Sequence, residues 1–441
     1  MQFGFRAGRS CEHALLVAQN EILASLSKKQ ISLLLLIDFS KAFDMVDHEI
    51  LLDKLYHYGI RGIAHKWFKS YLSNREQYVS IEGKSSSRRS LKYSVPQGSI
   101  LGPLLFIIYI NDIPNIHKTA KFILYADDAN IILTGNNMQE IETQFDELSS
   151  TLVKWVKYNG LSLNIKKTNY LIFTRKKNLD LKGFVPKIFG MSIEHKSVAR
   201  FLGVLIDDKL TWSHHIAALK SKMSRYVGIS YKLRNILPLS ARKMIFNSQF
   251  QSHLNYCSLV WGSSCKSNIE SLFTSQKKAI RSIMPGNVNY YFNNGKCPTR
   301  TKPAFKDFNI LTVHNVVIKN ILVFLNRIHN FPSSLPTSVK NTISSSSPSP
   351  YSNTDYNSDW YNTYNRTPYN TSTFFKGPLL YTNIMTENSQ LSINTSFNSY
   401  KQRMKSFLLE VQCSGNFQEW EPQNFSLTNL PGLRRSARLN S

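Results

Sequence analysis

The sequence is poor in cysteine, contains few acidic residues and has no long hydrophobic run. Five cysteines are scattered over 441 residues without a C-x-x-C pair, so neither a disulfide framework nor a zinc knuckle is indicated. The longest apolar stretches, near 33–37 and 101–110, are too short to span a bilayer. These absences exclude transmembrane, collagen-like and small secreted classes. We expect a protein of the nucleus or cytoplasm, without a signal peptide or a membrane anchor.

Basic residues are abundant by comparison. Lys and Arg number 54 against 28 Asp and Glu, which gives a formal net charge of +26. An excess of this size favours a polyanionic partner, and nucleic acid is the first candidate. An acidic membrane surface would require a basic amphipathic helix or a long apolar span, so we expect no membrane partner. The apolar fraction of 42% is enough for a sizeable core.

The apolar pattern changes along the chain. Over roughly the first 260 residues, short strand-like runs alternate with segments of helical period, such as 137–158, while the run 103–110 fits either a helix or a strand. Helical spacing dominates from 213 to 255. The pattern predicts an α+β domain followed by a mostly helical one. Ser, Asn, Tyr, Pro and Thr then dominate 332–373, which is typical of a linker.

Three carboxylates stand where charge is unusual. Asp38 ends a short apolar strand, and Asp127 and Asp128 are expected in the turn of a hairpin between two apolar runs. An acid pair beside an acid on a neighbouring strand suits two divalent cations, because two-metal phosphoryl transfer needs hard oxygen ligands on a rigid backbone. The alternative is that turn-favouring Asp residues simply form the hairpin.

Several further blocks accompany these acids in a fixed order. They are Gln2-Phe3-Gly4-Phe5-Arg6 with Gly8-Arg9-Ser10, Asp38–Asp44, Val95–Pro103, Tyr125-Ala126-Asp127-Asp128, Trp155 with Asn159–Asn164 and Lys167-Thr168, and Phe201-Leu202-Gly203 with Asp207, Leu210, Trp212 and His215. In order and spacing they resemble the reverse transcriptase region of non-LTR retrotransposons, close to jockey/CR1-like elements. The resemblance runs from residue 1 to about 285.

The resemblance implies a right-hand polymerase of α+β class, with an antiparallel-sheet palm, partial fingers and a helical thumb. The expected parts are partial fingers (1–30), a palm with inserted finger elements (31–212, the reverse transcriptase domain covering about 1–206), a helical thumb (213–286), a connection region (287–331), a linker (332–373) and a C-terminal region with a basic tail (374–441).

The resemblance also implies catalytic roles. Asp38, Asp127 and Asp128 would bind two Mg²⁺ ions, with Mn²⁺ as a substitute. Lys167 would lie near the pyrophosphate as a general acid. The alternative for Lys167 is one more solvated lysine beside Lys166.

Substrate contacts follow in the same way. Phe43 would be the bulky residue that excludes a ribose 2′-hydroxyl, although ordinary core packing would also explain it. Gln97 and Gly98 would contact the incoming nucleotide, and Tyr125 would support the primer terminus. Further contacts with template, primer or triphosphate are expected from Arg6, Arg9, Asn74, Arg75, Phe201, Leu202 and Gly203.

The function implied is an RNA-directed DNA polymerase whose partners are an RNA template, a DNA primer and dNTPs. The family's first finger block and its endonuclease domain have no counterpart in this sequence, so we expect an N-terminally truncated product of a longer element. Two alternatives stay open. One is a catalytically impaired product that only binds nucleic acid. The other is a viral RNA-dependent RNA polymerase, against which Phe43 and the Ala-Asp-Asp sequence argue.

Overall fold

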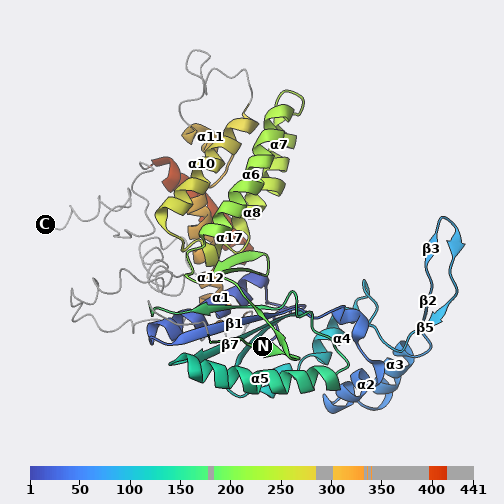
Figure 1. The fold of residues 1–441 in the computed structure, drawn as a ribbon. Coiled ribbons are helices and arrows are strands. Elements are labelled where there is room, and N and C mark those ends of the chain that lie inside the picture. The colour runs from blue at the N-terminus through green and yellow to red at the C-terminus, as the bar shows by residue number, and fades with distance from the viewer. Residues whose placement is uncertain (177–182, 285–300, 332–334, 336–338, 340–396, 415–441) are drawn as a thin grey trace. The chain divides into compact units, whose positions relative to one another are not determined.

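A computed structural model of the chain describes residues 1–176, 183–284, 301–331, 335, 339 and 397–414 (Figure 1). The chain divides into two compact units, one of Met1–Ala14 with Glu21–Leu202 and one of Leu15–Asn20 with Gly203–Ser441. Helix α1 (Cys11–Ser27) contributes to both. Almost all of the expected linker, and the basic tail, lie outside the described residues.

The first unit is built on a five-stranded sheet of order β11-β8-β1-β7-β6. Its strands are β1 (Ile31–Ile37), β6 (Lys121–Tyr125), β7 (Asp128–Gly135), β8 (Asn169–Phe173) and β11 (Glu194–His195). Strand β1 lies in the middle and runs antiparallel to both β7 and β8. All seven of its residues are buried, which explains why its sequence is a continuous apolar run rather than an alternating one.

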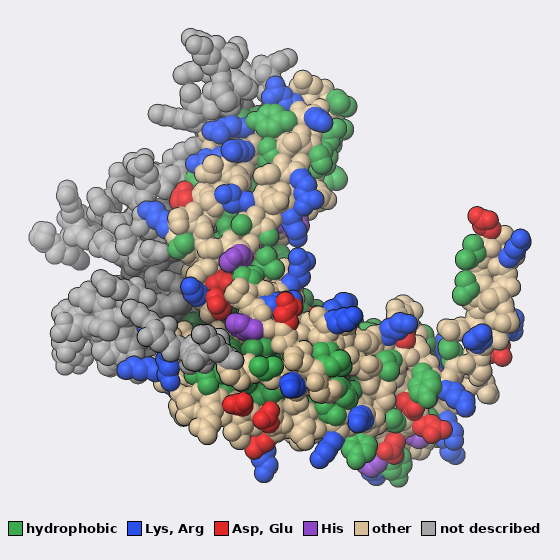
Figure 2. All heavy atoms as spheres, viewed as in Figure 1, with side chains coloured by type: hydrophobic (Ala, Val, Ile, Leu, Met, Phe, Trp, Pro, Cys, Tyr) green, Lys and Arg blue, Asp and Glu red, His purple; other side chains and the backbone are tan. Residues whose placement is uncertain are grey.

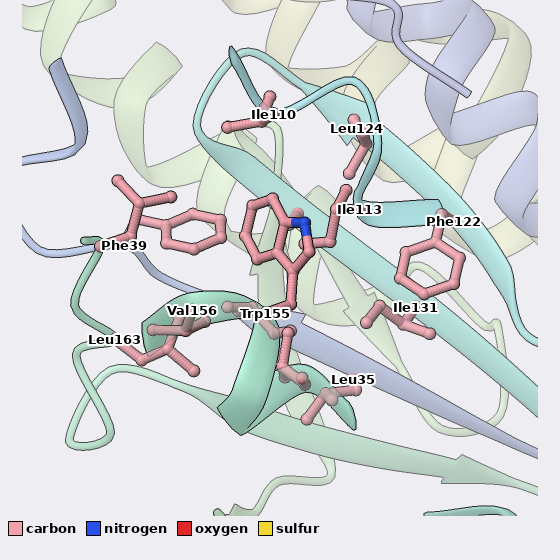
Figure 3. Packing of buried hydrophobic residues seen from close by; sticks show 14 of the residues in the cluster. Leu35, Phe39, Ile110, Ile113, Phe122, Leu124, Ile131, Trp155, Val156 and Leu163 are labelled. Carbon is pink, nitrogen blue, oxygen red and sulfur yellow. The ribbon is translucent and has the colours of Figure 1, made fainter. Parts of the chain in front are cut away.

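Helix α5 (Met138–Tyr158) contacts β1 and β7 and closes the core. The apolar residues at helical spacing over 137–158 form its buried side, and the helix ends at Tyr158. Figure 3 shows the Trp155 ring among apolar side chains from several elements, including Leu35, Phe39, Ile110, Ile113, Leu124 and Leu163. The core therefore lies directly beneath the segments that carry the candidate acids.

The remaining helices of the sheet unit follow local signals. Helix α2 (His48–His57) begins where the Asp47 carboxylate accepts the N–H groups of Glu49 and Ile50. The ambiguous run 103–110 forms most of helix α4 (Leu101–Tyr109). The other elements of this unit are η1 (Ala42–Met45), α3 (Gly62–Leu72), β2 (Glu76–Gln77), β3 (Ser80–Ile81), β4 (Lys84–Ser85), β5 (Arg89–Ser90), η2 (Ile113–Ile116), β9 (Lys187–Ile188), β10 (Met191–Ser192) and β12 (Val198–Phe201).

The second unit is mostly helical, as the sequence predicts. Its elements are β13 (Val204–Asp207), α6 (Ser213–Leu233), α7 (Leu239–Phe246), the π-helical turn η3 (Asn247–Gln251), α8 (Ser252–Asn255), α9 (Ser258–Trp261), α10 (Lys266–Ile283), α11 (Lys302–Asp307), α12 (Val313–Asn330) and α17 (Phe397–Ser414). Helices α12 and α17 share a small core that includes Leu322 and Met404. Within the described residues, no helix is both long and apolar enough to span a bilayer.

Candidate active site

The sheet register brings the acids together. In the β1–β7 ladder Ile37 pairs with Ala129, so continuing the register by one residue places Asp38 opposite Asp128. Side chains directly opposite each other in an antiparallel pair lie on one face. The turn differs from the sequence prediction, because Tyr125 pairs with Asp128 across the β6–β7 hairpin. Only Ala126 and Asp127 form the turn, and Asp128 is the first residue of β7.

The carboxylates influence one another electrostatically. Desolvation raises the pKa of Asp128 to about 6, and the negative charges of Asp127 and Asp38 add to the rise. A carboxyl that resists ionisation at a sheet end is a recognised sign of a functional cluster. The three acids therefore form one electrostatic group.

A loop before β8 supplies a cation. The Nζ atom of Lys167 lies 3.8 Å from Oδ2 of Asp38. The loop is hydrogen-bonded to Asp38 on both sides: the Asn164 N–H donates to the Asp38 carbonyl at 2.8 Å, and the Asp38 N–H donates to Thr168 Oγ1 at 3.4 Å. The backbone that carries Lys167 is therefore tied to Asp38, and the lysine ammonium lies next to that carboxylate.

The donor set fits hard divalent cations in its chemistry, because it consists of carboxylate oxygens on rigid strand ends. In the part of the chain that the structure describes, however, no three His, Cys, Asp or Glu side chains stand close enough to hold a metal ion as they are. Ligation by the three acids would need their side chains to converge.

Two of the expected nucleotide-contacting residues are connected to η1: Phe43 belongs to it, and Gln97 is hydrogen-bonded to it. Phe43 stacks on Phe106 with ring centroids 4.4 Å apart, and its carbonyl accepts the N–H of Val95 at 3.0 Å. Gln97 Nε2 donates to Asp44 Oδ1 at 3.0 Å. The segment around Gln97 is thereby fastened to the segment that follows Asp38. Sequence reasoning missed Asp44 as the partner of Gln97, although it closes the block that begins at Asp38.

Gly98 adopts a φ of +82° and is exposed. A Cβ at this position would meet no atom within 4 Å. The backbone conformation, rather than lack of space, is what requires glycine here. Tyr125 is half-buried at the end of β6.

The N-terminal block, which the sequence places in the fingers, also pairs with the central sheet. Gln2 forms a parallel bridge with Leu124 of β6. Arg6 is exposed. The Arg9 guanidinium donates to the Gln2 carbonyl and lies 5.6 Å from the centroid of the Phe3 ring. Desolvation, followed by the charge of Arg6, lowers the pKa of Arg9. Arg9 therefore stabilises the N-terminal block itself.

The expected template contacts lie at the base of the hairpin built from β2 to β5. Asn74 is exposed with a φ of +54°, and the Arg75 guanidinium lies 5.4 Å from the centroid of the Tyr71 ring. Figure 2 shows hydrophobic and basic side chains side by side on the hairpin, where Tyr78 and Ile81 are among the exposed apolar residues. Aromatic and cationic groups in such proximity suit the binding of single-stranded nucleic acid.

The expected primer-contacting segment follows β12. The Phe201 side chain is 1% exposed and packs inside the protein. Leu202 is half-buried and Gly203 is exposed, and both have a positive φ. Any contact between a nucleic-acid strand and this segment is therefore left to Leu202 and Gly203.

A family comparison agrees with this geometry. The family model "Reverse transcriptase (RNA-dependent DNA polymerase)" matches residues 1–206. Residues 1–206 are thus similar to reverse transcriptases. The matched segment contains the sheet, the three acids and Lys167.

Similar curated proteins come from mobile elements of Drosophila melanogaster. The "Probable RNA-directed DNA polymerase from transposon X-element" is 27% identical over 64% of this chain and 31% of its own length. The corresponding protein of transposon BS is 27% identical over 76% and 37%. The chain thus spans about a third of the length of these relatives. Among solved structures, apo telomerase from Candida tropicalis matches with a TM-score of 0.37 at 13% identity, over 76% of this chain and 54% of the telomerase.

Neutralising Asp128 should stabilise the metal-free protein at alkaline pH. Its folded-state pKa of about 6 lies above the ordinary 3.8, so the ionised carboxylate opposes folding above pH 6 and the effect fades as pH falls towards 4. We expect Asp128→Asn to melt about 2–4 °C higher than wild type at pH 8 in EDTA. The gain should shrink at pH 5.

The matched control is Asp146→Asn, which removes an exposed carboxylate from α5 outside the cluster. It should leave the melting temperature nearly unchanged at both pH values. Equal melting of Asp128→Asn and wild type at pH 8 would show that the three acids do not repel one another in the folded protein.

Proposed function

We propose that this chain is an RNA-directed DNA polymerase of a non-LTR retrotransposon. It would add deoxynucleotides to a primer 3′-hydroxyl by phosphoryl transfer on an RNA template. The observation that carries this proposal is the β1–β7 register, which ends at the Ile37–Ala129 pair directly beside Asp38 and Asp128. Asp127 lies in the adjoining turn, and the Lys167 Nζ lies 3.8 Å from Asp38 Oδ2. The reverse transcriptase domain and the +26 charge support this proposal.

The proposed cofactor is a pair of Mg²⁺ ions, with Mn²⁺ as a substitute, held by Asp38, Asp127 and Asp128. Such ions lower the pKa of the primer hydroxyl and stabilise the charge of the triphosphate and of the leaving pyrophosphate. The acids contribute rigid placement, because each stands at the end of a paired strand or in a two-residue turn. Their mutual repulsion, which Lys167 offsets only in part, favours the binding of cations at this site.

Lys167 has a separate proposed role. The Lys167 ammonium would donate a proton to the leaving pyrophosphate oxygen. Its side chain is 70% exposed, so it can reach towards a bound triphosphate without disturbing the core.

The remaining residues are proposed to bind and orient the substrates. Gln97 and Gly98 would contact the incoming nucleotide, and Tyr125 would support the primer terminus. Contacts with the template, primer or triphosphate are proposed for Arg6, Arg9, Asn74, Arg75, Leu202 and Gly203, with Phe201 contributing through the packing of its segment. Most of these contacts would be to phosphate and sugar, so they would not depend on sequence.

The polymerase proposal is tested by primer extension. The full chain is given a DNA primer on an RNA template with dNTPs and Mg²⁺. We expect extension by wild type and a loss of roughly 10²- to 10³-fold or more in Asp127→Asn, because the variant removes a charge aimed at the reacting phosphate. Asp53→Asn is the control, since it removes a carboxylate that is 74% exposed on α2.

Equal extension by Asp127→Asn and wild type would refute the assigned site. A folded wild type that binds primer–template in a salt-dependent way but never extends it would refute the active enzyme. The chain would then be a product that only binds nucleic acid.

Phe43 is the proposed discriminator between deoxynucleotides and ribonucleotides. Its ring is held by stacking on Phe106, which fixes a bulky group next to the expected nucleotide. We expect Phe43→Val to raise the efficiency of rNTP relative to dNTP incorporation by roughly 10- to 100-fold.

The measurement is the ratio of kcat/KM for rNTP and dNTP, which does not depend on the fraction of folded enzyme. An unchanged ratio together with a lower melting temperature would assign Phe43 to core packing alone.

A further inference from the structure

The acidic hairpin turn is held from outside the sheet by one side chain. Gln2 Oε1 accepts a hydrogen bond from the Ala126 N–H at 3.0 Å and another from the Gly4 N–H at 2.7 Å. Gln2 is only 5% exposed, so water competes little for these bonds. Residue 2 thereby reaches the turn that carries Asp127.

The turn needs such an acceptor. Ala126 has a φ of +52°, a conformation that disfavours residues other than glycine. Ala126 is 6% exposed, and a buried N–H without an acceptor is costly. The two-residue turn between β6 and β7 is thus held in a strained shape by a bond to Gln2.

Backbone hydrogen bonds between the N-terminal segment and β6 hold Gln2 next to the turn. The Phe3 N–H donates to the Leu124 carbonyl at 2.7 Å, and the Leu124 N–H donates to the Met1 carbonyl at 2.8 Å. At Gly4, an added Cβ would lie 2.4 Å from the Ala126 nitrogen. Only glycine allows so close an approach to the turn.

The Nε2 end of the Gln2 amide shows that the side chain acts through its Oε1 atom. Nε2 is buried and has no hydrogen-bond partner among the described residues. Flipping the amide would turn Nε2 towards two N–H donors, so the orientation is fixed. The unpaired Nε2 is tolerated because Oε1 satisfies two backbone donors.

We propose that Gln2 is a positioning residue of the polymerase, which fixes the Ala126–Asp127 turn and thereby the place of the Asp127 carboxylate. The role rests on the proposed function, since it concerns the approach of Asp127 to the reacting groups. Small displacements of such a group are costly, because catalysis depends on near-attack geometry. Gln2 acts through the turn and touches no substrate.

Hydrogen exchange at the turn tests this role without any activity. The full chain and its variants carry the same N-terminal tag, so all begin alike. Gln2→Met removes the acceptor at similar volume, and exchange of the Ala126 amide should accelerate roughly 10-fold. Gln2→Glu keeps a carboxylate oxygen as acceptor and should retain the protection.

The control is Gln144→Met. Gln144 Nε2 donates to the Thr134 carbonyl at 3.0 Å, near the other end of β7. This variant also loses a glutamine bond to the same hairpin, but it should leave exchange at Ala126 unchanged.

Primer extension supplies the second readout. For Gln2→Met we expect kcat to fall roughly 10- to 100-fold and the Mg²⁺ concentration for half-maximal rate to rise. The KM for dNTP should stay within about twofold, because the expected nucleotide contact of Gln97 lies on another segment.

Each outcome decides the proposal. Unchanged exchange at Ala126 in Gln2→Met overturns it, and so does faster exchange across the whole sheet, which marks a purely structural role. Faster exchange confined to the turn with unchanged kcat and Mg²⁺ dependence also overturns it. A wild type that does not extend primers counts against the proposed function alone, and exchange at Ala126 then decides whether Gln2 fixes the turn.

Discussion

The pairing of β1 with β7 is the constraint on which the candidate site depends. A slip of one residue would turn every side chain of β1 to the other face of the sheet and move Asp38 away from Asp128. The slip is prevented because β1 is buried along its whole length and β7 along most of it. The same apolar contacts that form the core therefore align the acids.

This alignment works against the stability of the metal-free protein. Burial of Asp128, together with the negative charges of Asp127 and Asp38, raises the pKa of Asp128 to about 6. Lys167 offsets part of the charge from a loop tied to the Asp38 backbone. Functional sites commonly violate the local rules of stability in this way.

Much of this arrangement could be predicted from the sequence. The apolar run 31–37 predicts a buried strand, the spacing over 137–158 predicts a helix, and the ordered blocks bring the acids and Lys167 into one site. The exact turn could not be predicted, because the pairing of Tyr125 with Asp128 leaves Asp128 in the strand. Local patterns carry no information on which residues pair at a strand end.

Contacts between segments far apart in the chain could not be predicted from the sequence either. Gln2 and Ala126 are 124 residues apart, and no local pattern indicates that a glutamine side chain will accept from a turn amide. Gln97 and Asp44 are 53 residues apart, yet their blocks lie together in the fold. The positive φ of Ala126 and Gly98, next to these contacts, is likewise seen only in the structure.

We propose that the three acids converge around divalent cations once substrate is present. The direct measurement is the number of Mn²⁺ ions bound per chain, followed by electron paramagnetic resonance with an RNA template, a chain-terminated primer and the matching dNTP. The account predicts two ions for wild type and a loss of bound Mn²⁺ in Asp38→Asn. Equal Mn²⁺ binding by wild type and this variant would contradict it.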